Sequence, residues 1–165
     1  MAEEWTAWLK QHGAALVLFA RQWAPAPADA EDIVQEGFVR FWRSRHRAAD
    51  PVAYLYACVK RYGLEWLRSR RRRLRREEAA ARPELVNQES LFQGSLEQAE
   101  RRQALEEALQ RLPEEQREVV VLKIWGGLAF PQIAEALHIS ANTAASRYRY
   151  ALAKLRDQLA EEPIL

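Results

Sequence analysis

The sequence contains little cysteine, histidine and glycine. Its 165 residues include one cysteine, Cys58, which excludes an internal disulfide and any cysteine-rich metal site. The three histidines are scattered without metal-ligand spacing, and no glycine-rich phosphate loop is present. We therefore expect no metal, no cofactor and no catalytic residues, so the chain is not expected to be an enzyme.

Long hydrophobic runs are also absent. Although 48% of the residues are hydrophobic, no uninterrupted apolar run approaches the ~20 residues that a transmembrane helix needs. Residues 1–13 are acidic and amphipathic, unlike a signal or transit peptide. We expect no membrane insertion and a cytoplasmic location.

Charge is segregated along the chain, although the formal net charge is only +2. Residues 40–76 contain thirteen Lys and Arg against two acids. Residues 77–118 contain eleven acids and five Arg, and residues 119–156 contain five basic residues and one acid. This pattern indicates two surfaces that face nucleic acid, joined by a segment that does not.

Apolar residues recur at helical spacing through most of the chain, and no stretch is a convincing β-strand. The first predicted helix covers roughly residues 3–23, and the second begins near Asp29. The third begins at Asp50-Pro51 and continues into the Arg run that ends at Arg76, and a further helix covers about residues 96–111. Residues 77–95 lose periodicity and contain a proline and a glycine. We predict an all-α fold with two small helical domains, residues 1–76 and 96–165, joined by a flexible linker over 77–95.

Residues 112–155 have the pattern of a lead helix followed by a helix-turn-helix. Gly126 and Gly127 can end the lead helix in a left-handed cap, and Ser140 is a good N-cap for the last helix. That helix has a predicted buried stripe of Tyr148, Leu152, Leu155 and Leu159. Its polar face fits the DNA major groove, N-terminal end first. The candidate contacts are Ser140, Asn142, Thr143, Ser146, Arg147, Arg149 and Tyr150. An ordinary bundle helix with a solvated face is the alternative interpretation.

Two blocks carry a family resemblance. The first includes Leu112, Pro113, Gln116, Arg117, Gly127, Leu128, Ile133, Ala134, Ile139, Ser140, Thr143, Ser146 and Arg147 in register, and resembles region 4 of bacterial sigma factors. LuxR-type response regulators share that helix-turn-helix. The second block, DAEDIVQEGFVRFW over residues 29–42, resembles sigma region 2, which LuxR-type proteins lack. The chain thus resembles RNA polymerase sigma factors of the extracytoplasmic-function (ECF) type.

This resemblance implies a promoter-specificity subunit that binds core RNA polymerase, with an anti-sigma factor as a further partner. Polymerase docking on the β′ clamp helices would use Asp29, Asp32, Gln35 and Glu36, and region 4 would contact the β flap. A simpler interpretation of the acidic residues is that they stabilise the first helical turn through its dipole. Region 4 would recognise −35 DNA, and RNA synthesis itself would belong to the polymerase.

The helix that begins at Pro51 interleaves aromatic residues with cations, which suits melting and holding a −10 strand because rings stack on unpaired bases and cations neutralise phosphates. The spacing predicts that Tyr62 and Trp66 lie in the core. The resemblance places His46 in a loop that captures a flipped −10 base. The candidate −10 contacts are His46, Tyr54, Lys60, Arg61, Arg68 and Arg71.

The chain departs from the family pattern at several positions. Arg61 stands where the family usually has Asn, which predicts a different −10 preference. Ala129 replaces a Ser N-cap, a change that costs about 1 kcal/mol. His138 replaces the turn glycine, and Ala145 removes a cation expected to meet phosphate.

Two other functions fit parts of the sequence. A sigma-like helix-turn-helix regulator would bind DNA without acting as a true sigma factor, and a protein-interaction adaptor would use the basic helices on acidic partners. Salt-sensitive, sequence-dependent DNA binding separates the adaptor from the other two.

Overall fold

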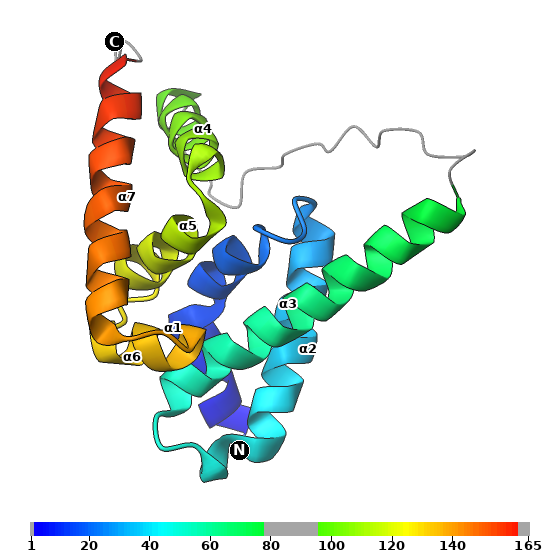
Figure 1. Ribbon diagram of the computed structural model, residues 1–165. Helices are drawn as coiled ribbons and strands as arrows, with labels where there is room; N and C mark the ends of the chain where they lie inside the picture. Colours follow the sequence, from blue (N-terminus) through cyan, green and yellow to red (C-terminus); the bar gives the residue numbers. More distant parts are fainter. Residues whose placement is uncertain (1, 78–95, 162–165) are drawn as a thin grey trace.

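The computed structural model describes residues 2–77 and 96–161, and the regular elements in those ranges are all helical (Figure 1). The all-α prediction is confirmed. The elements are α1 (Ala2–Ala20), α2 (Pro27–Ser44), the 3-10 turn η1 (Arg45–Arg47), α3 (Pro51–Arg76), α4 (Leu96–Arg111), α5 (Glu114–Val120), the π-helical segment η2 (Val121–Trp125), α6 (Phe130–Leu137) and α7 (Ala141–Glu161). Except for Glu77, the predicted linker over 77–95 lies outside the described residues. Among the helices described, none combines the length and apolar character needed to span a bilayer.

Local sequence explains where the N-terminal helices begin and end. α3 begins at Pro51, and the Asp50 side chain caps it by accepting from the Ala53 N–H at 3.1 Å, as predicted. α2 begins at Pro27, earlier than predicted. Proline is favoured at the first position of a helix, because the backbone N–H that it lacks would have no partner within the helix there. α1 ends at Ala20 rather than near residue 23, and the last predicted residues form a turn instead.

The helix-turn-helix is confirmed by α6, α7 and the turn between them. Gly127 has φ of 66° and His138 has φ of 56°, so both adopt the left-handed conformation. The Ser140 hydroxyl accepts from the Thr143 N–H at 3.0 Å and caps α7. At the start of α6, the Gln132 side chain accepts from the Ala129 N–H at 3.0 Å, which supplies one half of a capping box that alanine cannot complete.

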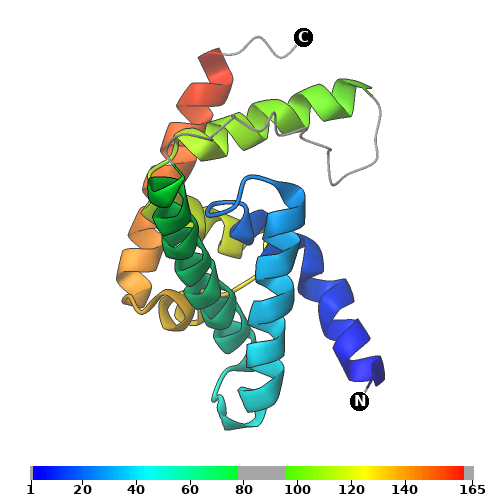
Figure 2. The ribbon, with the colours of Figure 1, turned by 90° about the vertical axis from the view of Figure 1, so that its right-hand side faces the viewer.

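The N-terminal half consists of α1, α2 and α3, which lie beside one another (Figure 2). Aromatic side chains fill the core between these helices. Phe19, Phe38, Phe41 and Tyr56 are fully buried. Edge-to-face contacts join them, with ring centroids 5.7 Å apart for Phe38 and Phe41 and 5.8 Å apart for Phe19 and Tyr56. Cys58 is also buried and belongs to the same apolar cluster.

The same core continues into the C-terminal half. η2 packs on α1 and α6 packs on α3, so that Leu122, Leu128 and Ile133 belong to one buried cluster with Phe19 and Tyr56. A second, smaller cluster joins α4, α5 and α7. The two halves therefore lie against each other in this structure.

The predicted buried stripe of α7 is partly wrong. Leu155 is buried, but Tyr148, Leu152 and Leu159 are only half-buried. The fully buried positions are Ala144 and Ala151. α7 packs on α5 and α6, and methyl side chains at these two positions allow a close approach that larger residues would prevent.

His12 of α1 gives the fold a pH dependence. His12 is 5% exposed, its Nδ1 lies 3.4 Å from the Tyr56 hydroxyl, and burial lowers its pKa. Since the unfolded chain then binds the proton more readily, His12 contributes stability above its ordinary pKa of about 6.5, and that stability is lost as pH falls through the lowered value. In His12→Gln, the drop in unfolding free energy between pH 7 and pH 5, measured by urea denaturation, should be smaller than in the wild type. An equal drop in both proteins would contradict this assignment.

Candidate polymerase and promoter interfaces

The acidic candidates form one stripe on α2. Asp29, Asp32 and Glu36 are spaced by three and four residues, which places them along one helical face with Gln35 at its edge. Asp32 and Gln35 are exposed, and Asp29 and Glu36 are half-buried. The predicted docking residues are thus brought together on an accessible surface.

Arginines partly balance this stripe. Arg70 of α3 lies 3.4 Å from Asp29, while Arg40 lies 3.5 Å from Glu36 and 3.1 Å from Glu65. These pairs are at least one-third exposed, so each contributes little to stability. They leave Asp32 as the most accessible carboxylate of the three.

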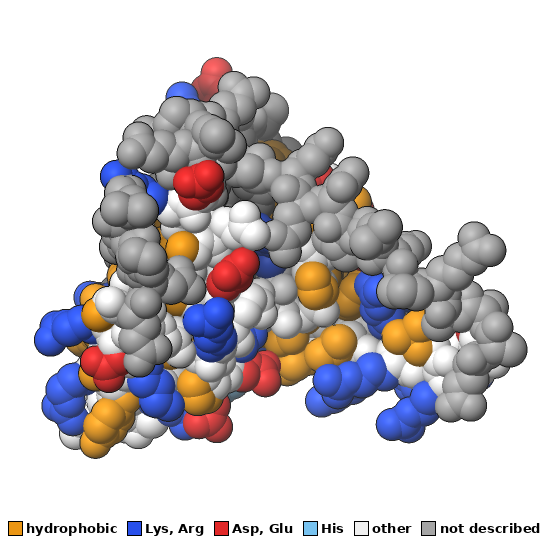
Figure 3. Space-filling view, turned by 90° about the horizontal axis from the view of Figure 1, so that it is seen from above, with side chains coloured by type: hydrophobic (Ala, Val, Ile, Leu, Met, Phe, Trp, Pro, Cys, Tyr) orange, Lys and Arg blue, Asp and Glu red, His pale blue; other side chains and the backbone are white. Residues whose placement is uncertain are grey.

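The projecting end of α3 carries a basic surface, where Arg side chains gather (Figure 3). Arg61, Arg68 and Arg71 are exposed on this helix, and His46 is exposed on η1. Tyr54 is half-buried near the start of α3. These five −10 candidates therefore extend from η1 along α3.

Tyr62 and Trp66 depart from the prediction that they lie in the core. Both rings are half-buried, and each has a guanidinium over it: Arg40 at 4.8 Å from the Tyr62 centroid and Arg70 at 5.3 Å from that of Trp66. Cation–π contacts explain why these rings are stable at a partly exposed position.

The predicted −35 contacts on α7 fall into two groups. Ser140, Asn142, Arg149 and Tyr150 are exposed, and the Arg149 guanidinium lies 5.5 Å from the ring centroid of Tyr150, a residue that is 58% exposed. The other three candidates, Thr143, Ser146 and Arg147, are half-buried. The Ser140 hydroxyl donates to the Thr143 hydroxyl at 2.8 Å, Arg147 lies 3.7 Å from Glu115, and Ser146 is half-buried.

Lys60, the remaining −10 candidate, faces the C-terminal half. Its ammonium lies 3.0 and 3.1 Å from the two carboxylate oxygens of Glu118 in α5. Glu118 is 3% exposed, and burial raises its pKa even though Lys60 opposes the shift. A buried position for Glu118 was not predicted, although this residue directly precedes four consecutive buried apolar residues, 119–122.

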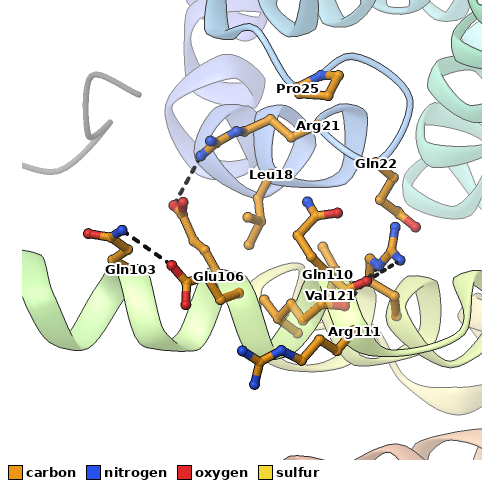
Figure 4. Close-up of a pocket in the computed structure, with 12 residues that line it drawn as sticks. Leu18, Arg21, Gln22, Pro25, Gln103, Glu106, Gln110, Arg111 and Val121 are labelled. Carbon is orange, nitrogen blue, oxygen red and sulfur yellow. Dashed lines mark hydrogen bonds and ion pairs between the residues drawn. The ribbon is translucent and has the colours of Figure 1, made fainter. Parts of the chain in front are cut away.

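Two further polar contacts cross between the halves. The Trp23 indole N–H donates to Glu114 at 3.3 Å, and Arg21 lies 3.0 Å from Glu106. Figure 4 shows Arg21 and Glu106 pointing toward each other beside a cavity of about 390 Å³ that is bordered by the end of α1, by α4 and by α5. Within the described ranges, no three His, Cys, Asp or Glu side chains are grouped to hold a metal ion.

Comparison with known proteins gives the family. The family models for Sigma-70 region 2 and for Sigma-70, region 4 match residues 8–73 and 102–155. RNA polymerase sigma-E factors of Streptomyces avermitilis and Streptomyces coelicolor are 33% and 34% identical to this chain, over 94% of it and over 85% and 86% of their own lengths. The chain belongs to the sigma-70 family. Within that family it is an ECF-type sigma factor, and the ECF RNA polymerase sigma factor SigE of Mycolicibacterium smegmatis is 30% identical over 95% of this chain and 62% of SigE.

Solved structures share the fold of this sigma-70 family protein. The sigma factor RpoE of Bartonella quintana, solved in complex with the anti-sigma factor NepR, has a TM-score of 0.73 at 21% identity and covers 97% of this chain and 99% of its own. CnrH, solved in complex with the cytosolic domain of CnrY, has a TM-score of 0.64 at 24% identity and covers 98% and 92%.

The match boundaries show which sigma region each surface occupies. The α2 stripe, η1 and α3 as far as residue 73 lie in region 2, and Glu118 and residues 141–155 of α7 lie in region 4. A cavity of about 350 Å³ lies between these regions, with Arg47 and Tyr54 on one side and Glu135 and His138 on the other. Region 4 of this sigma-70 family protein therefore lies against part of its candidate −10 surface.

Proposed function

We propose that this chain is a promoter-specificity subunit that binds core RNA polymerase and directs transcription initiation. The observation that carries the proposal is the acidic stripe of α2 on the same chain as two separate basic surfaces, in a protein of the sigma-70 family. The stripe docks on the β′ clamp helices of the polymerase, and region 4 contacts the β flap.

Promoter DNA is recognised in two places. α7 enters the −35 major groove with its N-terminal end, where Asn142 and Arg149 reach base edges or phosphates. η1 and α3 hold the melted −10 strand, with Tyr54 stacking on an unpaired base and Arg61, Arg68 and Arg71 contacting phosphates.

The chain itself catalyses no reaction under this proposal, because the polymerase supplies the chemistry of RNA synthesis. It acts in the cytoplasm, where polymerase and promoter are found. Its activity is restrained by an anti-sigma factor. Two similar structures support this last point, since the RpoE structure contains the anti-sigma factor NepR and the CnrH structure contains the cytosolic domain of CnrY.

In-vitro transcription with bacterial core polymerase and a library of candidate promoters tests the proposal. We expect transcripts from templates that share defined −35 and −10 sequences, and none from core polymerase alone. Binding to core polymerase without transcripts would favour a sigma-like regulator. Loss of both polymerase and DNA binding would favour the adaptor.

Arg149→Ala tests the −35 surface. Because the exposed guanidinium contacts DNA in the proposed complex, we expect promoter duplex affinity to fall by roughly 5- to 150-fold, the range for losing a good base contact of ~1–3 kcal/mol. Fluorescence anisotropy of holoenzyme on labelled duplex measures this. Arg156→Ala is the matched control, since Arg156 is also exposed on α7 but lies two turns further from the N-terminal end. Equal losses in the two variants would show that only bulk charge is sensed.

A further inference from the structure

We propose that the cavity at the end of α1 binds a small, largely apolar carboxylic acid that also carries a hydroxyl or N–H donor. The cavity lies where the turn after α1, residues 21–23, meets α4, α5 and η2 (Figure 4). None of the described residues that line it is a candidate polymerase, −10 or −35 contact. The site therefore adds a ligand-binding function that depends on neither polymerase nor DNA.

The cavity has the size and lining of a small-molecule pocket. Its volume of about 390 Å³ lies within the range of roughly 300–1,000 Å³ that such pockets have. Leu18, Leu109 and Val121 line it with apolar side chains, and the latter two are buried. Gln103 and Gln110 of α4 also line it and are exposed, so a ligand can enter from solvent along α4.

Arg21 provides a buried positive charge in this cavity. The residue is 9% exposed, and its Nη1 donates to Glu106 at 3.0 Å. In the described part of the chain this is the one hydrogen bond of the guanidinium, which has five N–H donors, so donors remain for a ligand carboxylate. The charged residues that line the cavity are three Arg and two Glu, an excess of one positive charge that also favours an anion.

Gln22 provides an acceptor that has no donor. Its Nε2 donates to the Phe19 carbonyl at 3.1 Å, which fixes the orientation of the amide, because the opposite orientation would place two oxygens together. The Oε1 atom at the other corner of the amide is buried and has no hydrogen-bond partner among the described residues. A buried acceptor without a donor is unfavourable, and a hydroxyl or N–H group of a ligand would satisfy it.

The two polar groups decide between classes of ligand. A purely apolar molecule would leave the Gln22 oxygen without a donor, and a cationic molecule would meet the excess of positive charge. A carboxylic acid with a second, hydrogen-bonding group satisfies both Arg21 and Gln22, while its apolar part lies against Leu18 and Val121.

Isothermal titration calorimetry of the full chain with 4-hydroxyphenylacetate tests the site, because this probe combines a carboxylate, an apolar ring and a hydroxyl. We expect one molecule to bind per chain. The analogue 4-hydroxyphenylacetamide lacks the charge and should bind roughly 10- to 100-fold more weakly, and phenylacetate, which lacks the hydroxyl, roughly 2- to 10-fold more weakly. Absence of binding, or equal affinity for all three compounds, would overturn the proposal.

Three variants place the probe in the cavity. Leu18→Trp fills the cavity and should abolish binding, whereas Leu9→Trp, the same substitution at a 36% exposed position of α1, should leave the affinity unchanged. Gln22→Met does not depend on how well the larger side chain is tolerated. It removes the acceptor at similar side-chain length, so 4-hydroxyphenylacetate and phenylacetate should bind this variant equally. Wild-type affinity in Leu18→Trp, or a preference for the hydroxyl that survives in Gln22→Met, would show that the probe binds elsewhere and that the assignment is wrong.

Discussion

Replacing Asp32 and Glu36 together by arginine is expected to weaken binding to bacterial core polymerase by at least ~100-fold. Close charge pairs across protein interfaces contribute about 1.5–7 kcal/mol, and each ~1.4 kcal/mol is a factor of ten in affinity. Asp32 is exposed and Glu36 is half-buried on the same stripe of α2, so both carboxylates face the proposed partner. Titration of labelled protein with core polymerase measures the effect, and transcription should fall in parallel.

Glu31→Arg is the matched control. Glu31 is also exposed on α2 but lies about 100° around the helix from Asp32, outside the stripe. If the acids had no role beyond stabilising the helix, the double variant would bind polymerase as the control does. That outcome would remove the docking role of the stripe.

Much of the fold could be predicted from the sequence because its determinants are local. Asp50 followed by Pro51 starts α3, Ser140 caps α7, and Gly127 takes the left-handed conformation. Each of these features depends on a few residues that are close together in the sequence. Even the unusual His138 takes the left-handed turn expected of the glycine it replaces.

The packing of the two halves could not be predicted in the same way. Periodicity shows which face of a helix is apolar but not which helix covers it. The predicted stripe of α7 therefore favoured large residues such as Leu152, whereas close packing on α5 and α6 buries Ala144 and Ala151.

In the candidate site, too, some features follow from local sequence and others depend on tertiary packing. Helical spacing places the acidic residues of α2 on one face, and in the structure Asp32 is exposed on that face as Arg149 is on α7. Lys60 carries a positive charge, as its neighbour Arg61 does, but its ammonium contacts Glu118, which lies 58 residues further along the chain. Only the three-dimensional packing separates these two cations.

Leu122→Ala provides a test of whether the two halves share one core, and we expect it to lower the free energy of unfolding by about 2–5 kcal/mol. Leu122 is fully buried in η2, within the cluster that also contains Phe19 and Tyr56. Urea denaturation followed by tryptophan fluorescence is the suitable measurement. Five of the six tryptophans, Trp5, Trp8, Trp23, Trp42 and Trp66, lie in the N-terminal half.

The probe and the substitution are thus in different halves of the chain. Independent halves would leave the main fluorescence transition unchanged by Leu122→Ala, whereas a shared core shifts it to lower urea. Ile124→Ala removes a similar side chain from the same segment, but Ile124 is 49% exposed and its change should stay within ~0.5 kcal/mol. A shift of the main transition would show that one buried leucine of region 4 affects the tryptophans of region 2, because the two halves then unfold as one cooperative unit.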